Sequence, residues 1–330
     1  MQMTNEPLLL LLSFGVARIR LIAHEMENLP TKYVRAFLFA MVVGLAPIYG
    51  VHPQSTGSTQ THSPNRTTLN QFVRRIQEKA RTLETASGMR SGFQSFTLSH
   101  NLPEKSVRYF DFVVVRLLFE ATRDAGYWNL HWDITDQPPN SDRIWQQWKS
   151  AAKPSPLVPT ATAECDELSA LYAFLVERPG VKGVGLFWPA ANHTVAVWTV
   201  HPIGAPIIRV VVPTSQIFVH EDDLFDAKKF NPWHQKTIYE YTRRDVPDSF
   251  EIPTALIDFF LEQVDKYGAA SDAMLQRLRY LREGVFLKQW TAEYAAREVV
   301  ARRDLLKNAS AEDIAALRNF AQDMRTRARQ

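Results

Sequence analysis

The chain has only one cysteine among 330 residues, Cys165, and this scarcity excludes several classes of protein. No intramolecular disulfide can form, and no cysteine pair is present to hold a zinc ion. The histidines offer no HxxxH or HxH spacing either, since four of them are scattered, namely His131, His201, His220 and His234. We therefore expect neither a metal nor a cofactor.

Other signatures are missing as well. The sequence contains no P-loop, no glycine pattern for dinucleotides and no GxSxG, so a nucleotide-binding protein or a serine hydrolase has no local support. Basic residues number 38 against 35 acidic ones, and the resulting net charge of +3 is spread along the chain. Nucleic acid is therefore not an expected partner, because its binding needs a concentrated basic surface.

The first 50 residues predict a signal peptide or an N-terminal membrane anchor. Lys32 and Arg35 precede "AFLFAMVVGLAPIYG" at 36–50, an apolar run of signal-peptide length that is short for a membrane span. Met26 is the more ordinary start for such a signal. We expect an exported protein, in the periplasm, cell envelope or extracellular space, with membrane attachment through 36–50 as one form. A buried N-terminal helix is the alternative.

The remaining chain divides into four predicted regions. Residues 51–68 are rich in Ser, Thr, Pro and Gln, which cannot bury a core, and they predict a disordered linker. Residues 69–152 form an N-terminal helical region, with Ser141 as the expected cap of a short helix over 142–152. Residues 153–225 read as a helix followed by an antiparallel sheet, and 226–330 as a C-terminal helical region, with long helices over 253–268, 271–306 and 310–329. The fold class is α+β.

The segment "ECDELSALYAFL" places Cys165 at the first turn of a predicted helix. Unpaired N–H groups and the helix dipole at such a position favour an anion, so we expect a lowered thiol pKa and donors for an oxyanion. The neighbouring acids, Glu164, Asp166 and Glu167, are ordinary partners of a helix dipole and form no calcium motif.

His193 lies 28 residues downstream, at the entrance to the strand "TVAVWTV". The next strand, "IIRVVVP", returns antiparallel and brings Pro213 to Gln216 back beside this histidine. A helix start and a strand start can face each other at one edge of a helix-on-sheet core. The order of elements therefore predicts a Cys/His pair with Cys165 as nucleophile and His193 as general base.

This order resembles the bacterial type of the transglutaminase-like, papain-like Cys/His cysteine peptidase superfamily. Members carry "DCDDLA"-like and "HAWVEV…WVPVDPT"-like sequences, and the matching pieces here are "ECDELSALYAFL", "NHTVAVWTV" and "IRVVVPTS". The resemblance covers residues 160–218. It implies a transglutaminase-like core and an acyl-transfer reaction through a Cys165 thioester on a peptide or protein substrate.

The resemblance departs from the family at the third catalytic residue. Val212 stands where the family has its aspartate, and no carboxylate lies between His193 and Glu221. Gln216 is the first candidate to orient the imidazole, with Thr214, Ser215, Asp222 and Asp223 as alternatives. Asn192 and Trp188 are candidates for substrate contact, although most tryptophans should be core.

Two forms of acyl transfer and one non-catalytic role remain open. With water as acceptor the protein is a cysteine peptidase or amidase cleaving peptide or isopeptide amides, and with an amine it is a transglutaminase. Hydrolysis is favoured because water needs no second binding site. The alternative class is a catalytically inactive module that binds a peptide or cell-envelope partner.

Overall fold

The computed structural model describes residues 65–103, 105–151, 158–190, 193–215, 224–227, 236–301 and 309–329. Residues 61–330 form one compact unit. The predicted targeting segment at 1–50 and nearly all of the predicted linker lie outside the described residues. The linker's last three residues, however, form strand β1 (Arg66–Thr68), which the sequence did not predict.

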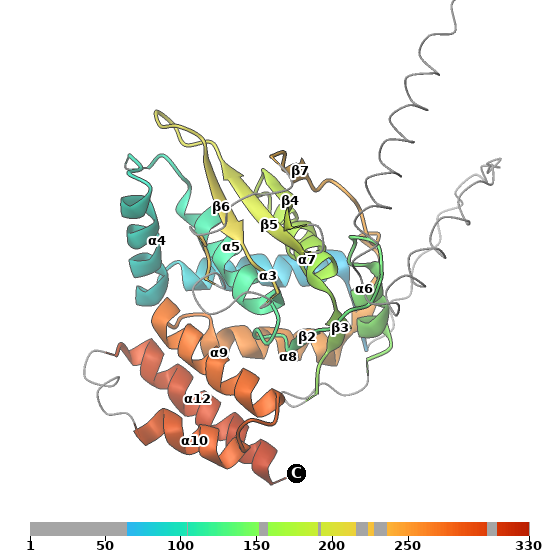
Figure 1. Ribbon diagram of the computed structural model, residues 1–330, viewed down its shortest axis with the longest axis vertical. Helices are drawn as coiled ribbons and strands as arrows, with labels where there is room; N and C mark the ends of the chain where they lie inside the picture. The colour runs from blue at the N-terminus through green and yellow to red at the C-terminus, as the bar shows by residue number, and fades with distance from the viewer. Residues whose placement is uncertain are drawn as a thin grey trace, which may run out of the picture. The chain divides into compact units, whose positions relative to one another are not determined.

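The described chain mixes helices and strands, which confirms the α+β class in its general sense. The helices are α3 (Leu69–Leu83), α4 (Ser87–Ser99), α5 (Tyr109–Thr122), α6 (Asp142–Lys149), α7 (Cys165–Glu177), α8 (Thr254–Tyr267), α9 (Asp272–Phe286), α10 (Ala292–Ala301) and α12 (Ala311–Ala328) (Figure 1). The strands are β1 (Arg66–Thr68), β2 (Leu130–Trp132), β3 (Ala161–Ala163), β4 (Val184–Ala190), β5 (His193–Val200), β6 (Ile208–Val212), β7 (Tyr239–Glu240) and β8 (Glu251–Pro253).

The main sheet has four strands in the order β6-β5-β4-β7, and all of its pairings are antiparallel. The predicted antiparallel arrangement of the strands at 184–212 is thus confirmed. Ala196 pairs with Val212 at one end of the β5–β6 ladder, and Val200 pairs with Ile208 at the other. A register shift between Phe187 and Ala190 interrupts the β4–β5 ladder close to His193.

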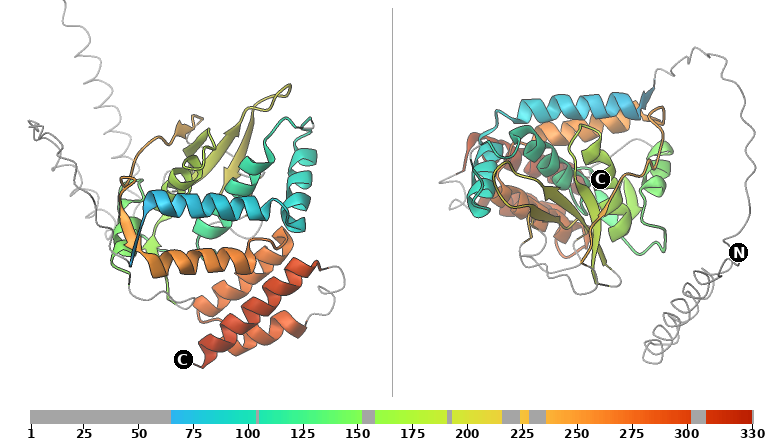
Figure 2. Two further views of the ribbon diagram at one scale, coloured as in Figure 1. Left: turned by 180° about the vertical axis from the view of Figure 1, so that it is seen from behind. Right: turned by 90° about the horizontal axis from the view of Figure 1, so that it is seen from above.

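Helix α7 packs against one face of this sheet and is buried on nearly all sides (Figures 1 and 2). Its sequence is apolar around the whole helix, as expected for an element enclosed by others. Ala196, Trp198 and Val200 of β5 join the core on the α7 side. Alternate residues point to opposite faces of a strand, and Val195 and Val197 accordingly belong to a second apolar cluster, with Phe187.

The helical regions that precede and follow the sheet in sequence pack into the same hydrophobic core as the sheet. Helix α3 begins with a capping box at Thr68 and lies alongside α8, as Figure 2 shows. Helix α12 is capped by Ser310, whose hydroxyl accepts a hydrogen bond from the N–H of Asp313, as the sequence suggests. The predicted helix over 271–306 is two helices, α9 and α10, because the chain turns at Lys288, where φ is +58°.

The predicted cap of α6 is wrong in its chemistry. Ser141 is the residue before the helix, but its hydroxyl makes no cap hydrogen bond. It donates instead to Asp245 Oδ2 at 2.6 Å and accepts from the Trp145 indole N–H at 2.9 Å. The Asp245 side chain is fully buried and also accepts from the Tyr241 hydroxyl at 2.7 Å. Ser141 therefore fastens α6 to the segment before α8.

Candidate active site

Cys165 is the first residue of α7, as the sequence predicts, and its acidic neighbours position this end of the helix. Glu167 Oε2 accepts hydrogen bonds from the Glu164 N–H at 3.0 Å and from the Thr135 hydroxyl at 2.7 Å. Glu164 Oε2 accepts from the Thr135 N–H at 2.8 Å. These two carboxylates tie the helix start to the segment that follows β2, so their first role is structural.

The Cys165 sulfur is close to the start of β5, where the Thr194 N–H lowers the pKa of the thiol. In β5, the even-numbered residues direct their N–H and C=O groups toward β6, but the β5–β6 ladder ends at Ala196 and Val212. Thr194 is the next such residue, and α7 lies against it. The Ser169 hydroxyl lies 3.2 Å from the Thr194 carbonyl oxygen and also donates to the Cys165 carbonyl oxygen at 2.7 Å.

His193, at the first position of β5, is buried with 2% of its surface exposed. Strand alternation groups its side chain with Val195 and Val197, on the face opposite α7. The Thr194 N–H, which lowers the pKa of the Cys165 thiol, points in the plane of the sheet toward the β6 side. Cys165 is thus placed near the backbone of the residue after His193, while the imidazole is directed to the other face of the strand.

The protonation state of Cys165 differs from the expected one. The pKa of the thiol is raised to about 11, chiefly by burial and further by the carboxylates of Asp166 and Glu164. The N–H groups of Thr194 and Asp166 act in the opposite direction but do not outweigh burial. The prediction of a lowered thiol pKa is therefore wrong for this conformation, because a sulfur that is 8% exposed loses more hydration than the helix start returns.

The imidazole is neutral as well, since burial lowers the pKa of His193 to about 4. A neutral thiol beside a neutral imidazole is thus the state of the site near pH 7. Asp166 contributes a further titrating group, because burial and the nearby Glu164 carboxylate raise its pKa to about 7. The charge beside the sulfur therefore changes within the physiological range of pH.

The structure describes only some of the candidates for the third site residue. Gln216, Asp222 and Asn192 lie outside the described residues. Thr214 is fully buried, and its hydroxyl lies 2.8 Å from the Ser169 hydroxyl, so it is engaged by α7. Ser215 is 1% exposed, and its hydroxyl has no hydrogen-bond partner among the residues that the structure describes. Continuing the β5–β6 register beyond its last pair sets Ser215 opposite His193.

Sequence reasoning missed Thr194 and Ser169, although a signal for the second exists. Ser169 lies four residues after Cys165, so both occupy the same face of α7. Trp188, the predicted groove residue, is half-buried against the core and makes an edge-to-face contact with Tyr239 at 5.9 Å between ring centroids. Trp188 and Tyr239 belong to β4 and β7, so their contact lies one strand away from β5, the strand near Cys165.

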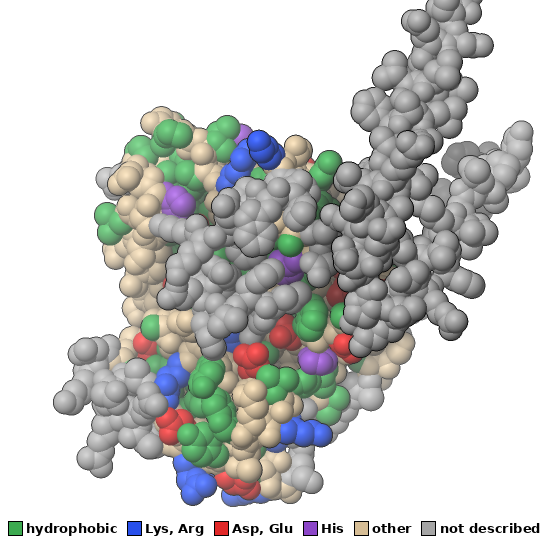
Figure 3. Space-filling model, in the orientation of Figure 1, with side chains coloured by type: hydrophobic (Ala, Val, Ile, Leu, Met, Phe, Trp, Pro, Cys, Tyr) green, Lys and Arg blue, Asp and Glu red, His purple; other side chains and the backbone are tan. Residues whose placement is uncertain are grey.

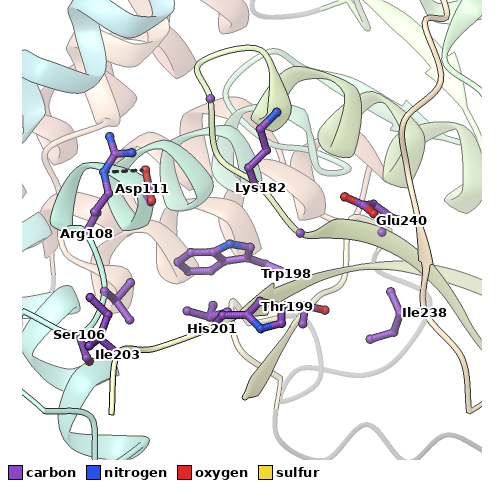
Figure 4. A pocket seen from close by; sticks show the side chains of 15 residues that line it. Ser106, Arg108, Asp111, Lys182, Trp198, Thr199, His201, Ile203, Ile238 and Glu240 are labelled. Atoms are coloured by element: carbon purple, nitrogen blue, oxygen red, sulfur yellow. Dashed lines mark ion pairs between the residues drawn. The ribbon is translucent and has the colours of Figure 1, made fainter. Parts of the chain in front are cut away.

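A cavity that could hold a small ligand lies away from this site. It has a volume of about 610 Å³ and is lined by the last residues of β5, the start of α5 and the edge of β4. Figure 4 shows Trp198 at its centre, with the ion pair Arg108 and Asp111 on one side and Lys182 above. Since strands rise about 3.3 Å per residue, this cavity is about 20 Å from His193 along β5.

Surface charge, the grouping of metal-ligand residues and the length of apolar helices each bear on an expectation from the sequence. Figure 3 shows blue and red side chains interspersed over the described part of the face in view. Within the described ranges, no group of three or more His, Cys, Asp or Glu side chains has the arrangement of a metal site. None of the described helices is both long enough and apolar enough to cross a bilayer.

Comparison with known proteins adds no relative: no family model, no curated protein and no solved structure matches this chain. The resemblance to transglutaminase-like peptidases therefore stays a prediction from the sequence of residues 160–218.

Proposed function

We propose that this protein is an acyl-transfer enzyme of the transglutaminase-like type, acting as a cysteine peptidase or amidase on a peptide or protein. The observation that carries the proposal is the link made by the Ser169 hydroxyl, which donates to the Cys165 carbonyl oxygen at 2.7 Å and lies 3.2 Å from the Thr194 carbonyl oxygen. It joins the start of a buried helix to the strand residue after His193, at the end of an antiparallel strand pair. Export and membrane attachment through residues 36–50 belong to the same proposal.

The proposed reaction begins from the neutral pair. Cys165 Sγ attacks the substrate carbonyl carbon while a ring nitrogen of His193 takes the thiol proton, because a preformed thiolate is disfavoured at a pKa of about 11. This transfer requires the imidazole to turn toward the sulfur from the face of β5 that it occupies in the structure. The Asp166 N–H, at the start of α7, is available to stabilise the oxyanion. His193 then gives its proton to the leaving amine as the C–N bond breaks, leaving a thioester. Water, deprotonated by His193, cleaves the thioester and restores the thiol.

Transglutamination uses the same steps with an amine in place of water. The carboxylates of Glu164 and Asp166 beside the sulfur would attract such an amine. Hydrolysis remains the preferred form of the proposal, because water needs no second binding site.

A non-catalytic binding module is the second candidate, and the burial of the pair favours it. Cys165 is 8% exposed and His193 is 2% exposed, and both are neutral near pH 7. A module derived from an enzyme would keep these residues as packing and would have no need of the family's aspartate, which Val212 replaces. Activity, and not geometry, separates the two candidates.

The deciding experiment is acylation of the full chain by p-nitrophenyl acetate. The enzyme proposal expects a burst of p-nitrophenol equivalent to the protein and an acetyl group on Cys165 by mass spectrometry. Cys165→Ala and His193→Ala should abolish the burst, and His201→Ala, at the other end of β5, should keep it. Release of p-nitrophenol at the same rate from wild type and Cys165→Ala would refute the enzyme and favour the binding module.

A further inference from the structure

A second cavity lies between β2 and the last turns of α9 and has a volume of about 410 Å³, which is within the range of small-molecule and side-chain sites. Its walls are mostly apolar or aromatic. The main lining residues are Leu130, His131, Trp132, Phe286, Leu287 and Asp124.

Two structural links connect this cavity to Cys165. Strand β2 pairs in parallel with β3, and Trp132 is in register with Ala163, two residues before Cys165. On the other side, the Asp124 N–H donates to the Thr214 carbonyl oxygen at 2.8 Å. The hydroxyl of Thr214 bonds Ser169, one helical turn after Cys165. These links place the Trp132 wall of the cavity beside the strand that leads directly into Cys165.

The charged groups around the cavity are engaged within the protein. The Asp124 carboxylate accepts a hydrogen bond from the Trp132 backbone N–H at 2.8 Å, and burial raises the pKa of Asp124. Arg282 donates to the Gly126 carbonyl oxygen at 3.0 Å. The His131 ring packs on the Phe286 ring with 4.5 Å between centroids. These contacts leave an environment of low polarity, which suits an apolar group better than a charged one.

One polar group in this wall is not engaged. The indole N–H of Trp132 is buried and has no acceptor among the residues that the structure describes, and it meets a ligand in the cavity once the Trp132 ring turns toward it. A buried donor without a partner costs free energy, and a ligand that supplies an acceptor recovers it.

We propose that this cavity is the specificity pocket of the Cys165 site and takes a large apolar side chain of the substrate, of the size of leucine or phenylalanine, with a substrate carbonyl oxygen accepting from the Trp132 indole N–H. The inference rests on the proposed function, since it assigns the substrate side chain that the acyl-transfer site prefers. Phe286 and Leu287 supply the apolar contact, and Trp132 fixes the orientation of the peptide.

Binding without chemistry tests the pocket itself. Full-length protein carrying Cys165→Ala is titrated separately with N-acetyl-phenylalanine amide and with N-acetyl-lysine amide. Ligand-observed NMR measures the binding of each amide. We expect the phenylalanine amide to bind roughly tenfold more tightly, as apolar pockets discriminate by about this factor. Phe286→Ala and Leu287→Glu should each weaken that binding, and Trp132→Phe, which removes only the N–H, should weaken it several-fold.

Leu98→Ala is the matched control, because Leu98 is an exposed apolar residue on α4 outside the cavity. It should leave binding unchanged. Since Leu287 is exposed, its variant should fold even if Phe286→Ala does not. Equal or tighter binding of the lysine amide, or binding that is unaffected by Leu287→Glu and Trp132→Phe, would overturn the inference.

Acylation of the cysteine-containing protein by the p-nitrophenyl esters of N-acetyl-phenylalanine and N-acetyl-lysine separates this inference from the proposed function. A preference for phenylalanine that Leu287→Glu removes supports both. Acylation without preference overturns the pocket and keeps the enzyme. Binding of the phenylalanine amide without any acylation overturns both the enzyme and the assignment of the pocket to its substrate.

Discussion

The Ser169 hydroxyl donates a hydrogen bond to the Cys165 carbonyl oxygen at 2.7 Å and lies 3.2 Å from the Thr194 carbonyl oxygen. The sole cysteine of the chain is therefore attached to the strand residue that follows His193, although 28 residues separate the two side chains in sequence. The attachment also buries both groups, and most of the predictions below follow from that burial.

The pH dependence of stability should report the raised pKa of Cys165. The folded state holds the thiol proton more tightly than the unfolded chain, so this stabilisation is present below pH 9 and is lost as the pH rises toward 11. The change from 9.0 to about 11 corresponds to about 3 kcal/mol. Urea unfolding of wild type and Cys165→Ala should show their difference in unfolding free energy changing by about 2 kcal/mol of this between pH 9 and 11.

The same pKa governs the reactivity of the thiol. At pH 8, iodoacetamide should alkylate the folded protein more slowly than the urea-unfolded protein, because less thiolate is present in the folded state. A difference in unfolding free energy that stays constant from pH 9 to 11, or faster alkylation of the folded protein, would contradict the burial of this sulfur.

His193 should destabilise the fold in acid. Its pKa is lowered from 6.5 to about 4, so the unfolded chain takes up a proton first as the pH falls. Stability that is present above pH 6.5 should be lost progressively down to pH 4, by about 3 kcal/mol. His193→Gln should lack this loss, measured by urea unfolding at pH 7, 5.5 and 4. The exposed His201→Gln should behave as wild type, and an equal acid loss in His193→Gln would show that the imidazole is not responsible.

Ser169 should contribute more to the free energy of unfolding than a typical serine in a helix does. Ser169→Ala removes hydrogen bonds to Cys165 and Thr194 and leaves the buried Thr214 hydroxyl without its partner. We expect a loss of about 2 kcal/mol in unfolding free energy. Ser150→Ala is the control, because the Ser150 hydroxyl bonds the Gln146 carbonyl oxygen four residues earlier in the same way but on the surface. Equal losses in the two variants would mean that the contacts with β5 contribute nothing.

Asp245 should be the most sensitive carboxylate for stability. It is buried and accepts from the Ser141 N–H and hydroxyl and from Tyr241. Asp245→Asn replaces an acceptor by a donor that faces other donors, and we expect a loss of about 3 kcal/mol by thermal or urea unfolding.

Asp258→Asn provides the comparison for Asp245. It breaks an exposed ion pair with Arg75 and should cost well under about 1 kcal/mol. A loss in Asp245→Asn no larger than that in Asp258→Asn would show that the buried hydrogen bonds around Asp245 do not stabilise the fold.

The elements that could be predicted from the sequence are those with a clear hydrophobic period. Helix α3 and the strands β4 to β6 are examples, and their positions agree with the pattern. Helix α4, "SGMRSGFQSFTLS", has no such period, since its buried residues are only Gly88, Met89 and Phe96. It is held by tertiary contacts: a Cβ on Gly88 would approach the Ala269 carbonyl oxygen to 2.6 Å. No local signal encodes that contact.

The candidate site likewise has features that the local sequence predicts and features that it does not. The positions of Cys165 and His193 at the starts of a helix and a strand could be predicted, because both depend on local sequence. The pKa of the thiol could not, since it depends on how deeply the whole chain buries the helix start. The parallel pair β2–β3, which brings Trp132 beside Ala163, was also missed, because two strands of three residues leave no periodic trace.

The contact between α7 and Thr194 has a consequence for self-association. A strand whose N–H and C=O groups are left open in the plane of a sheet is a template on which another chain can add a strand and begin to aggregate. Beyond the last β5–β6 pair, the N–H and C=O of Thr194 are covered by the thiol of Cys165 and the hydroxyl of Ser169. The residue proposed as nucleophile thus also closes this position to strand addition, and a variant that loosens the start of α7 would expose a new site for aggregation.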